Sequence, residues 1–265
     1  MVGNLLLRGM LAGLIAGLLA FCLAWYLGEP QVDRAIQFEE HAAMAEHAAE
    51  HAEEVAGGAA VHDHGDDEEE LVSRGVQGTI GLLTGVVVYG IGLGGLFSLV
   101  FAYAYGRVGS LEARSLALLL AIGAFFVVYW VPSLKYPANP PAVGQPETIG
   151  IRTGLFFTMV LFSLVAAAIA VSLGKHWVAR HGRWNGTIGA IVLFMVLVAV
   201  AQMFLPDINE VPSDFPAVTL WRFRIASWST QVLLWGGIGL IFGYLAERLL
   251  KQSPRVAHGT LARQT

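Results

Sequence analysis

Five of the chain's eight histidines lie within one hydrophilic stretch, residues 29–74, together with fourteen of its twenty aspartates and glutamates. Imidazole nitrogen binds Zn²⁺, Ni²⁺, Co²⁺ and Cu²⁺, and carboxylates add oxygen ligands and attractive charge. The composition favours weak collection of divalent cations over an acidic low-complexity segment with incidental histidines. The candidate metal ligands in this stretch are Glu29, His41, His47, His51, His62, Asp63 and His64.

The stretch divides into two parts. Residues 39–54 are rich in helix formers, and a helix there places His47 and His51 on one face, where they could share a metal ion. Residues 62–70 are acid-dense and interrupted by glycine, which predicts disorder. The five residues from His47 to His51 also match the H-x-x-E-H pattern of zinc peptidases, with Glu50 as the base. So short a match in an Ala/Glu/His segment makes the metalloenzyme the weakest alternative.

Long apolar runs surround this stretch. The chain has 265 residues, of which 14% are charged, whereas a soluble domain has about 25%. A transmembrane helix needs about 20 apolar residues. We therefore predict an all-α, polytopic membrane protein with six transmembrane helices, of which the third and the sixth have the least defined ends. The six candidates are residues 5–27, 76–105, 116–131, 151–173, 187–205 and 225–249.

Glycines recur at small-residue spacing within these segments, and this spacing predicts close contacts between helices. We expect the close-packed glycine helices also to form the path of the transported ion. The glycines concerned are Gly9, Gly13, Gly17, Gly81, Gly85, Gly239 and Gly243.

The basic residues predict how the chain is oriented. Ten of the sixteen lysines and arginines flank the N-terminus, the second and fourth loops and the C-terminus, which places both termini in the cytoplasm. The expected units are a first transmembrane helix, an acidic His-rich extracytoplasmic loop, a five-helix membrane domain and a cytoplasmic basic tail. They cover residues 1–28, 29–75, 76–250 and 251–265, and the membrane domain has Pro-rich outer loops at 132–150 and 206–224.

Eight of the ten prolines fall in these two outer loops. Proline fixes φ and stiffens a loop, so both loops are expected to hold a defined shape. With Glu29, they supply the candidate oxygen ligands Asn139, Glu147, Asp207 and Glu210. Their basic residues, Lys135, Arg222 and Arg224, are expected to pair with acids and hold the loops' shape.

The sequence also limits the energy source. It has no G-x-x-x-x-G-K-[ST] phosphate loop and no carboxylate in the middle of a span. A separate subunit would have to supply ATP-derived energy, or the route is channel-like or facilitated. Neither a tightly bound cofactor nor a nucleic-acid partner is expected.

A longer match links the chain to a known family. The string Val-Pro-Ser-Leu-Lys-Tyr-Pro-Ala-Asn-Pro-Pro at 131–141 resembles the CbtA family, the proposed cobalt transporter subunit. Leu-Leu-Arg-Gly at 6–9, Gly-Glu-Pro at 28–30, Val-Ser-Arg at 72–74 and the region 206–224 agree with it. The resemblance implies five spans, a role linked to cobalamin biosynthesis, and a partner resembling CbtB, a small single-span protein with a His-rich tail.

We therefore expect a bacterial inner-membrane subunit that takes up Co²⁺, with Ni²⁺ and Zn²⁺ as alternatives because their ligand types overlap. The partners are the metal ion, the lipid bilayer and a CbtB-like protein. The acidic His-rich loop would raise the local cation concentration, and the outer loops would hand the ion inward. The alternative from another class is a membrane scaffold that binds metal without conducting it. No enzymatic activity is expected.

Overall fold

Every regular element in the described residues of this computed structural model, 2–57, 73–141 and 143–252, is a helix. In chain order the elements are α1 (Val2–Leu27), α2 (Glu29–Gly57), α3 (Arg74–Val76), η1 (Gln77–Gly81), α4 (Leu82–Ala104), α5 (Ala113–Ala124), η2 (Phe125–Trp130), α6 (Val131–Lys135), η3 (Pro146–Thr148), α7 (Ile149–Phe204) and α8 (Ala217–Gln252).

Five helices are long and apolar enough to cross a membrane, which confirms the polytopic all-α prediction. They are Val2–Leu27, Arg74–Ala104, Ala113–Lys135, Pro146–Phe204 and Ala217–Gln252. The second and third each contain a π-helical segment, η1 and η2. The fourth helix contains two of the six predicted spans, 151–173 and 187–205, and each of the other four helices contains one.

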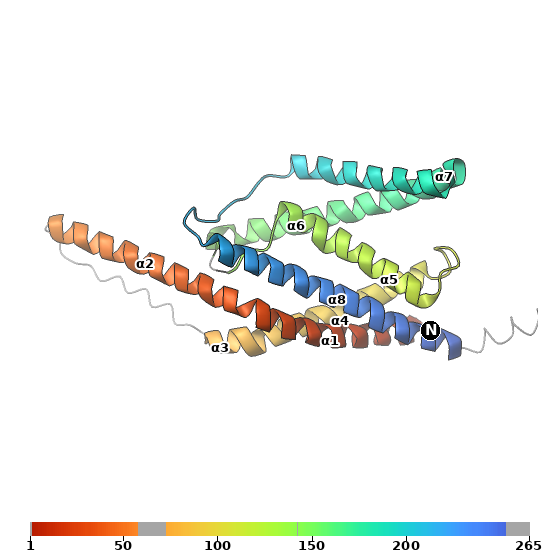
Figure 1. Cartoon of the computed structure of the whole chain (residues 1–265), viewed down its shortest axis with the longest axis horizontal. Coiled ribbons are helices and arrows are strands. Elements are labelled where there is room, and N and C mark those ends of the chain that lie inside the picture. The colour runs from red at the N-terminus through yellow and green to blue at the C-terminus, as the bar shows by residue number, and fades with distance from the viewer. Residues whose placement is uncertain (1, 58–72, 142, 253–265) are drawn as a thin grey trace, which may run out of the picture.

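Helix α7 folds back on itself at Gly182 (Figure 1). Gly182 has φ 82° and ψ 166°, a backbone conformation that is essentially restricted to glycine. Beyond the bend the two arms touch, since a Cβ added to Gly174 would lie 2.7 Å from Cβ of Ala190. The arms correspond to the predicted spans 151–173 and 187–205.

Glycines bring α1 and α4 into backbone contact. A Cβ at Gly13 would overlap the carbonyl oxygen of Gly90, and one at Gly94 would overlap that of Gly9. The predicted close contacts are thus confirmed on α1, whereas Gly85 on α4 faces open space. The touching backbones leave no room for an ion between these glycines, and the expectation that the glycine helices form the transport path stays a prediction.

Helix α8 completes the core against α1 and α5. A Cβ at Gly239 would meet Ala121, and one at Gly243 would meet Ala117, as the small-residue spacing predicts. Above these contacts the fully buried rings of Phe101 and Phe242 pack edge to face, with centroids 5.0 Å apart. The largest buried cluster accordingly joins α1, α4, α5 and α8.

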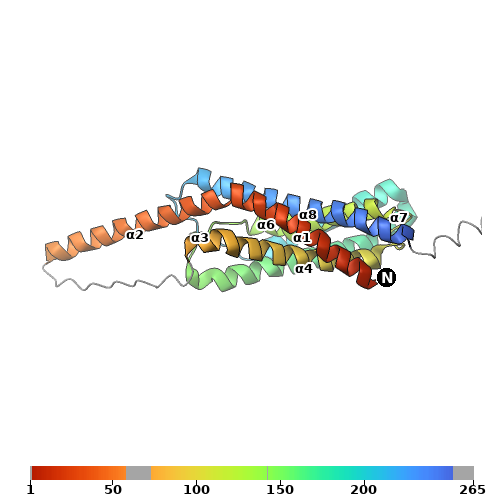
Figure 2. The ribbon, with the colours of Figure 1, turned by 90° about the horizontal axis from the view of Figure 1, so that it is seen from below.

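The hydrophilic stretch is helical over more of its length than expected. The helix predicted for 39–54 is observed as α2, which begins at Glu29 and extends past the end of the bundle (Figures 1 and 2). The chain stays nearly helical across Gly28, whose carbonyl accepts the N–H of Gln31 at 2.8 Å. Polarity ends the membrane span here, but alanine, glutamine and glutamate continue the helix. The predicted disorder of 62–70 lies outside the described residues.

Both Pro-rich outer loops are shorter than predicted. Residues 132–135 belong to α6, and residues 217–224 form the first turns of α8. Pro216 precedes α8, and its carbonyl accepts the N–H groups of Thr219 and Leu220. Hydropathy excluded this charged segment from the span, but the helix continues through it and points Arg224 into a pocket. The loops themselves cover residues 136–148 and 205–216.

Candidate functional site

One end of the bundle gathers α2, α3 and the loops 136–148 and 205–216 (Figures 1 and 2). The N-terminus, the connection between α4 and α5, the bend of α7 and the end of α8 lie at the other. This is the grouping that the distribution of lysine and arginine predicts. We call the first end the loop end.

A small apolar cluster holds the loop end together. Ala35 of α2, Val143 and Phe215 of the two loops are buried against one another. Phe38 adds an edge-to-face contact with Phe215, with ring centroids 5.2 Å apart. The two loops thus have the defined shape that their prolines predict, and the base of α2 is fixed to them.

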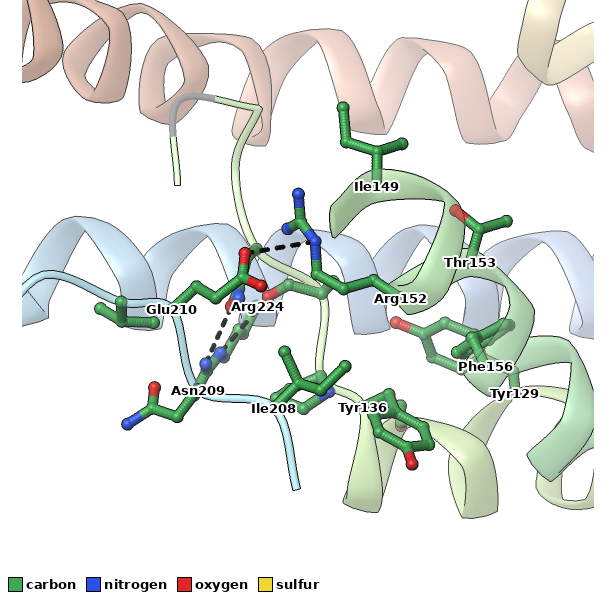
Figure 3. A pocket seen from close by; sticks show the side chains of 15 residues that line it. Tyr129, Tyr136, Ile149, Arg152, Thr153, Phe156, Ile208, Asn209, Glu210 and Arg224 are labelled. Carbon is green, nitrogen blue, oxygen red and sulfur yellow. Dashed lines mark hydrogen bonds and ion pairs between the residues drawn. The ribbon is translucent and has the colours of Figure 1, made fainter. Parts of the chain in front are cut away.

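A pocket of about 430 Å³ opens between the loops and the ends of three helices (Figure 3). Polar residues on its walls include Tyr129 of η2, Asn139 and Glu210 of the two loops, Arg152 of α7 and Arg224 of α8. Its lining therefore brings together segments far apart in sequence. We call it the arginine pocket.

Glu210 joins the two outer loops. Its carboxylate accepts hydrogen bonds from the Thr148 hydroxyl at 2.8 Å and the Gln145 backbone N–H at 3.0 Å, and Arg152 Nε lies 3.4 Å away. The bond from Thr148, with that from Gln145 and the charge of Arg152, lowers the pKa of Glu210 below its ordinary value of 4.5 despite some desolvation. Glu210 is therefore ionised and occupied by protein donors.

Arg224 lines the pocket from α8 and bonds the loop 136–148. Its Nη2 donates to the Asn139 side-chain oxygen at 2.9 Å, and its Nε donates to the Ala138 carbonyl at 3.3 Å. Both acceptors are neutral, and no carboxylate among the described residues lies within ion-pair distance of Arg224. The expectation that Arg224 holds a loop is confirmed, but its partner is an amide.

Lys135 behaves as expected, since it pairs with Asp207 across the loops. Beside it the Tyr136 hydroxyl donates to the Pro206 carbonyl at 2.8 Å. Both contacts tie the end of α6 to the start of loop 205–216. Arg222 is exposed on α8 and lines neither of the pockets described here.

The structure describes some of the candidate metal ligands but not all of them. Among the described residues, no three His, Cys, Asp or Glu side chains lie close enough together to hold a metal ion. His41, His47 and His51 are exposed along α2. His62, Asp63 and His64 lie outside the described residues.

The four candidate oxygen ligands of the outer loops are placed differently from one another. Asn139 bonds Arg224, Asp207 pairs with Lys135 and Glu210 bonds the neighbouring loop. Glu147 is exposed in η3. Three of the four thus already have protein partners.

Glu29 lies at a second pocket, of about 350 Å³, between α1, α4 and α8. It pairs with Arg74, which also lies 3.2 Å from Asp33. Ser227, on the wall of this pocket, shares a 2.8 Å hydrogen bond with Tyr129 of the arginine pocket. This bond links the two pockets beside α8.

Sequence reasoning missed Arg152 and Tyr129 as pocket residues. Arg152 was counted only as an outer charge, yet it is the one basic residue near the start of its span. Tyr129 is the phenol in the aromatic run Phe-Phe-Val-Val-Tyr-Trp of η2. A hydroxyl group within an apolar span was the sequence signal that could have marked Tyr129 as a functional residue. The structure adds that Tyr129 lies in a π-helical segment, a kind of segment that is frequent at functional sites.

Comparison with known proteins gives one match. The family model "Probable cobalt transporter subunit (CbtA)" matches residues 2–247. No curated protein and no solved structure matches the chain. The match covers all five membrane-length helices and both outer loops, and the protein therefore belongs to the CbtA family of probable cobalt transporter subunits.

Proposed function

We propose that this CbtA protein is the membrane subunit that takes Co²⁺ into the cell, with α2 as its cation collector. The observation that carries the proposal is the position of α2, which leaves the bundle at the end where both pockets open. The sequence of α2 holds three histidines, eight acids and one arginine. Dense negative charge raises the local concentration of cations and the rate at which they arrive.

The sidedness of the helices supports uptake over export. The four regions at the end opposite α2 carry eight of the fourteen lysines and arginines that the structure describes. The positive-inside rule assigns that end to the cytoplasm, so both termini are cytoplasmic and α2 faces outward at the inner membrane. A collector on this side meets metal before it is transported.

A partner completes the system. The family description calls the protein a subunit, and its described residues assemble no three metal ligands. A small CbtB-like protein with a single span and a His-rich tail would supply the ligands for a transfer site. A link to cobalamin biosynthesis, which the family resemblance implies, is part of this proposal.

The test is uptake of Co²⁺ by proteoliposomes that contain the protein with and without a CbtB-like partner. We expect time-dependent accumulation inside the vesicles, released by an ionophore, when both proteins are present. Metal that binds to the vesicles without accumulating would contradict transport. Parallel assays with Ni²⁺ and Zn²⁺ then rank the cargo.

The rival is a metal-binding membrane accessory that does not conduct the ion. The same proteoliposomes separate it from a transporter. A metalloenzyme built on the sequence 47–51 requires Glu50 as its base. We expect Glu50→Gln to leave Co²⁺ uptake unchanged, and complete loss of function in that variant would support the enzyme.

A further inference from the structure

The arginine pocket has a charge balance that a site for a bare metal cation would not have. Its charged lining consists of Arg152, Arg224 and Glu210. Glu210 accepts bonds from Thr148 and Gln145 and lies beside Arg152. Oε2 of the one carboxylate is therefore occupied by protein donors, and the lining carries one positive charge in excess.

Arg224 carries this excess charge. A guanidinium has five N–H donors in a planar fork, and the two bonds from Nε and Nη2 go to neutral oxygens. A partly buried cation without a counter-charge is costly, and a carboxylate or phosphate satisfies it best through two parallel bonds.

Arg152 supplies a second donor. Its Nη1 and Nη2 donate to the carbonyls of Val143 and Gln145, each at 3.3 Å. Its Nε is buried without a hydrogen-bond partner, although Glu210 is near. Figure 3 shows Arg152, Glu210 and Arg224 gathered in the same part of the pocket. Two guanidinium groups, one from α7 and one from α8, thus line the same pocket.

The size and walls of the pocket fit an organic ligand. Its volume of about 430 Å³ lies within the range of small-molecule sites. Six waters around an ion occupy about 180 Å³, less than half of this space. Tyr129, Tyr136 and Phe156 add aromatic walls that an organic body would contact.

We propose that the arginine pocket binds a small organic polycarboxylate, with Arg224 as its main partner and Arg152 as the second. This assignment adds a ligand to the proposed function. It rests on that function only in the statement that the divalent ion would enter the pocket as a carboxylate chelate. Binding of the carboxylate itself requires neither metal nor transport.

Isothermal titration of the purified, detergent-solubilised protein with citrate, without metal, tests the proposal. We expect saturable binding that weakens about tenfold or more in Arg224→Gln, since a hydrogen bond to a charged group contributes about 1.5–3 kcal/mol. Arg222→Gln is the matched control, because Arg222 is exposed two residues away on the same helix, and it should bind like the wild type. Arg224→Lys, which keeps the charge but loses the fork, should lie between them. No saturable binding, or equal losses in the two Gln variants, overturns the proposal.

A lipid headgroup offers similar chemistry, so a second arm uses soluble short-chain phosphatidylglycerol. If this lipid binds more tightly than citrate and depends on Arg224 in the same way, the occupant is a headgroup and the polycarboxylate assignment fails. Weaker binding of the lipid supports the assignment.

Glu210→Gln distinguishes an anion site from a cation site. Removing this charge frees Arg152, so citrate should bind several-fold more tightly, whereas a metal site with Glu210 as a ligand would lose Co²⁺ binding. Weaker citrate binding by Glu210→Gln, measured at a temperature at which the variant is folded, overturns the assignment. A wild type that transports Co²⁺ but does not bind citrate refutes only the pocket assignment. Citrate binding without transport refutes only the proposed function.

Discussion

Helix α2 and the arginine pocket lie at the same end of the molecule but differ in charge, exposure and order. The histidines of α2 are exposed on a helix that projects away from the bundle. The pocket residues come from three helices and two loops and are fixed by hydrogen bonds. Attraction of a cation requires charge density but no fixed geometry, whereas selection of a ligand requires both. Under the proposals made above, collection therefore belongs to α2 and selection to the pocket.

Reversing the charge of the pocket should have the largest effect. Arg224→Glu places a second carboxylate near Glu210, and two like charges oppose entry of an anionic chelate. We expect Co²⁺ uptake from citrate-containing medium to fall tenfold or more at every metal concentration, measured as initial rates in proteoliposomes. Arg222→Glu, which changes the same net charge at an exposed position, should stay within about twofold of wild type. A rise in uptake in Arg224→Glu would show that the pocket accepts the bare cation.

Deleting the collector should lower Co²⁺ uptake only at low Co²⁺ concentration. Removal of residues 39–70 eliminates most of the negative charge around α2, which works through local concentration. We expect the half-saturating Co²⁺ concentration to rise about tenfold, with the maximal rate unchanged. The matched control replaces the same residues with an Ala/Gln segment of equal length. Complete loss of uptake at saturating metal would make α2 part of the path and would remove the division of roles.

Salt should separate the two regions further. The Debye length falls from about 30 Å at 0.01 M to about 8 Å at 0.15 M ionic strength, which screens exposed charges more than enclosed ones. We expect the advantage of wild type over the deletion variant to shrink several-fold across this range. Citrate binding to the arginine pocket, measured by titration, should weaken less. If both fall together, the pocket is no more enclosed than α2.

The sequence predicts the features of this protein that depend on local patterns, such as the membrane spans. Segments such as 151–173 and 187–205 were identified because apolar length is a local property. Gly9 and Gly13 were recognised as contact residues because small-residue spacing is also local. The start of α2 at Glu29 was missed, since loss of hydropathy ends a span without ending a helix.

The pocket could not be predicted from local patterns. Arg152 and Arg224 are separated by the bend of α7 and by loop 205–216, and only the packing of α7, η2 and α8 brings them to one cavity. The sequence placed Asn139 and Glu210 correctly in outer loops but did not predict their partners. Their partners, Arg224 and the Thr148–Arg152 region, are properties of the tertiary structure.

The smallest predicted effect concerns acid and the loops that form the pocket. Because the folded protein lowers the pKa of Glu210, its ionised form is favoured by folding and contributes stability above the ordinary value of 4.5. That contribution is lost as the pH falls below this value through the lower, folded pKa. The difference in unfolding temperature between wild type and Glu210→Gln should be constant from pH 8 to about 6 and vanish in acid. Glu147→Gln, which changes an exposed carboxylate in the adjacent η3, should show little difference at any pH. A Glu210 difference that persists in acid would mean that Glu210 acts through shape alone and that its charge does not fix the wall of the pocket.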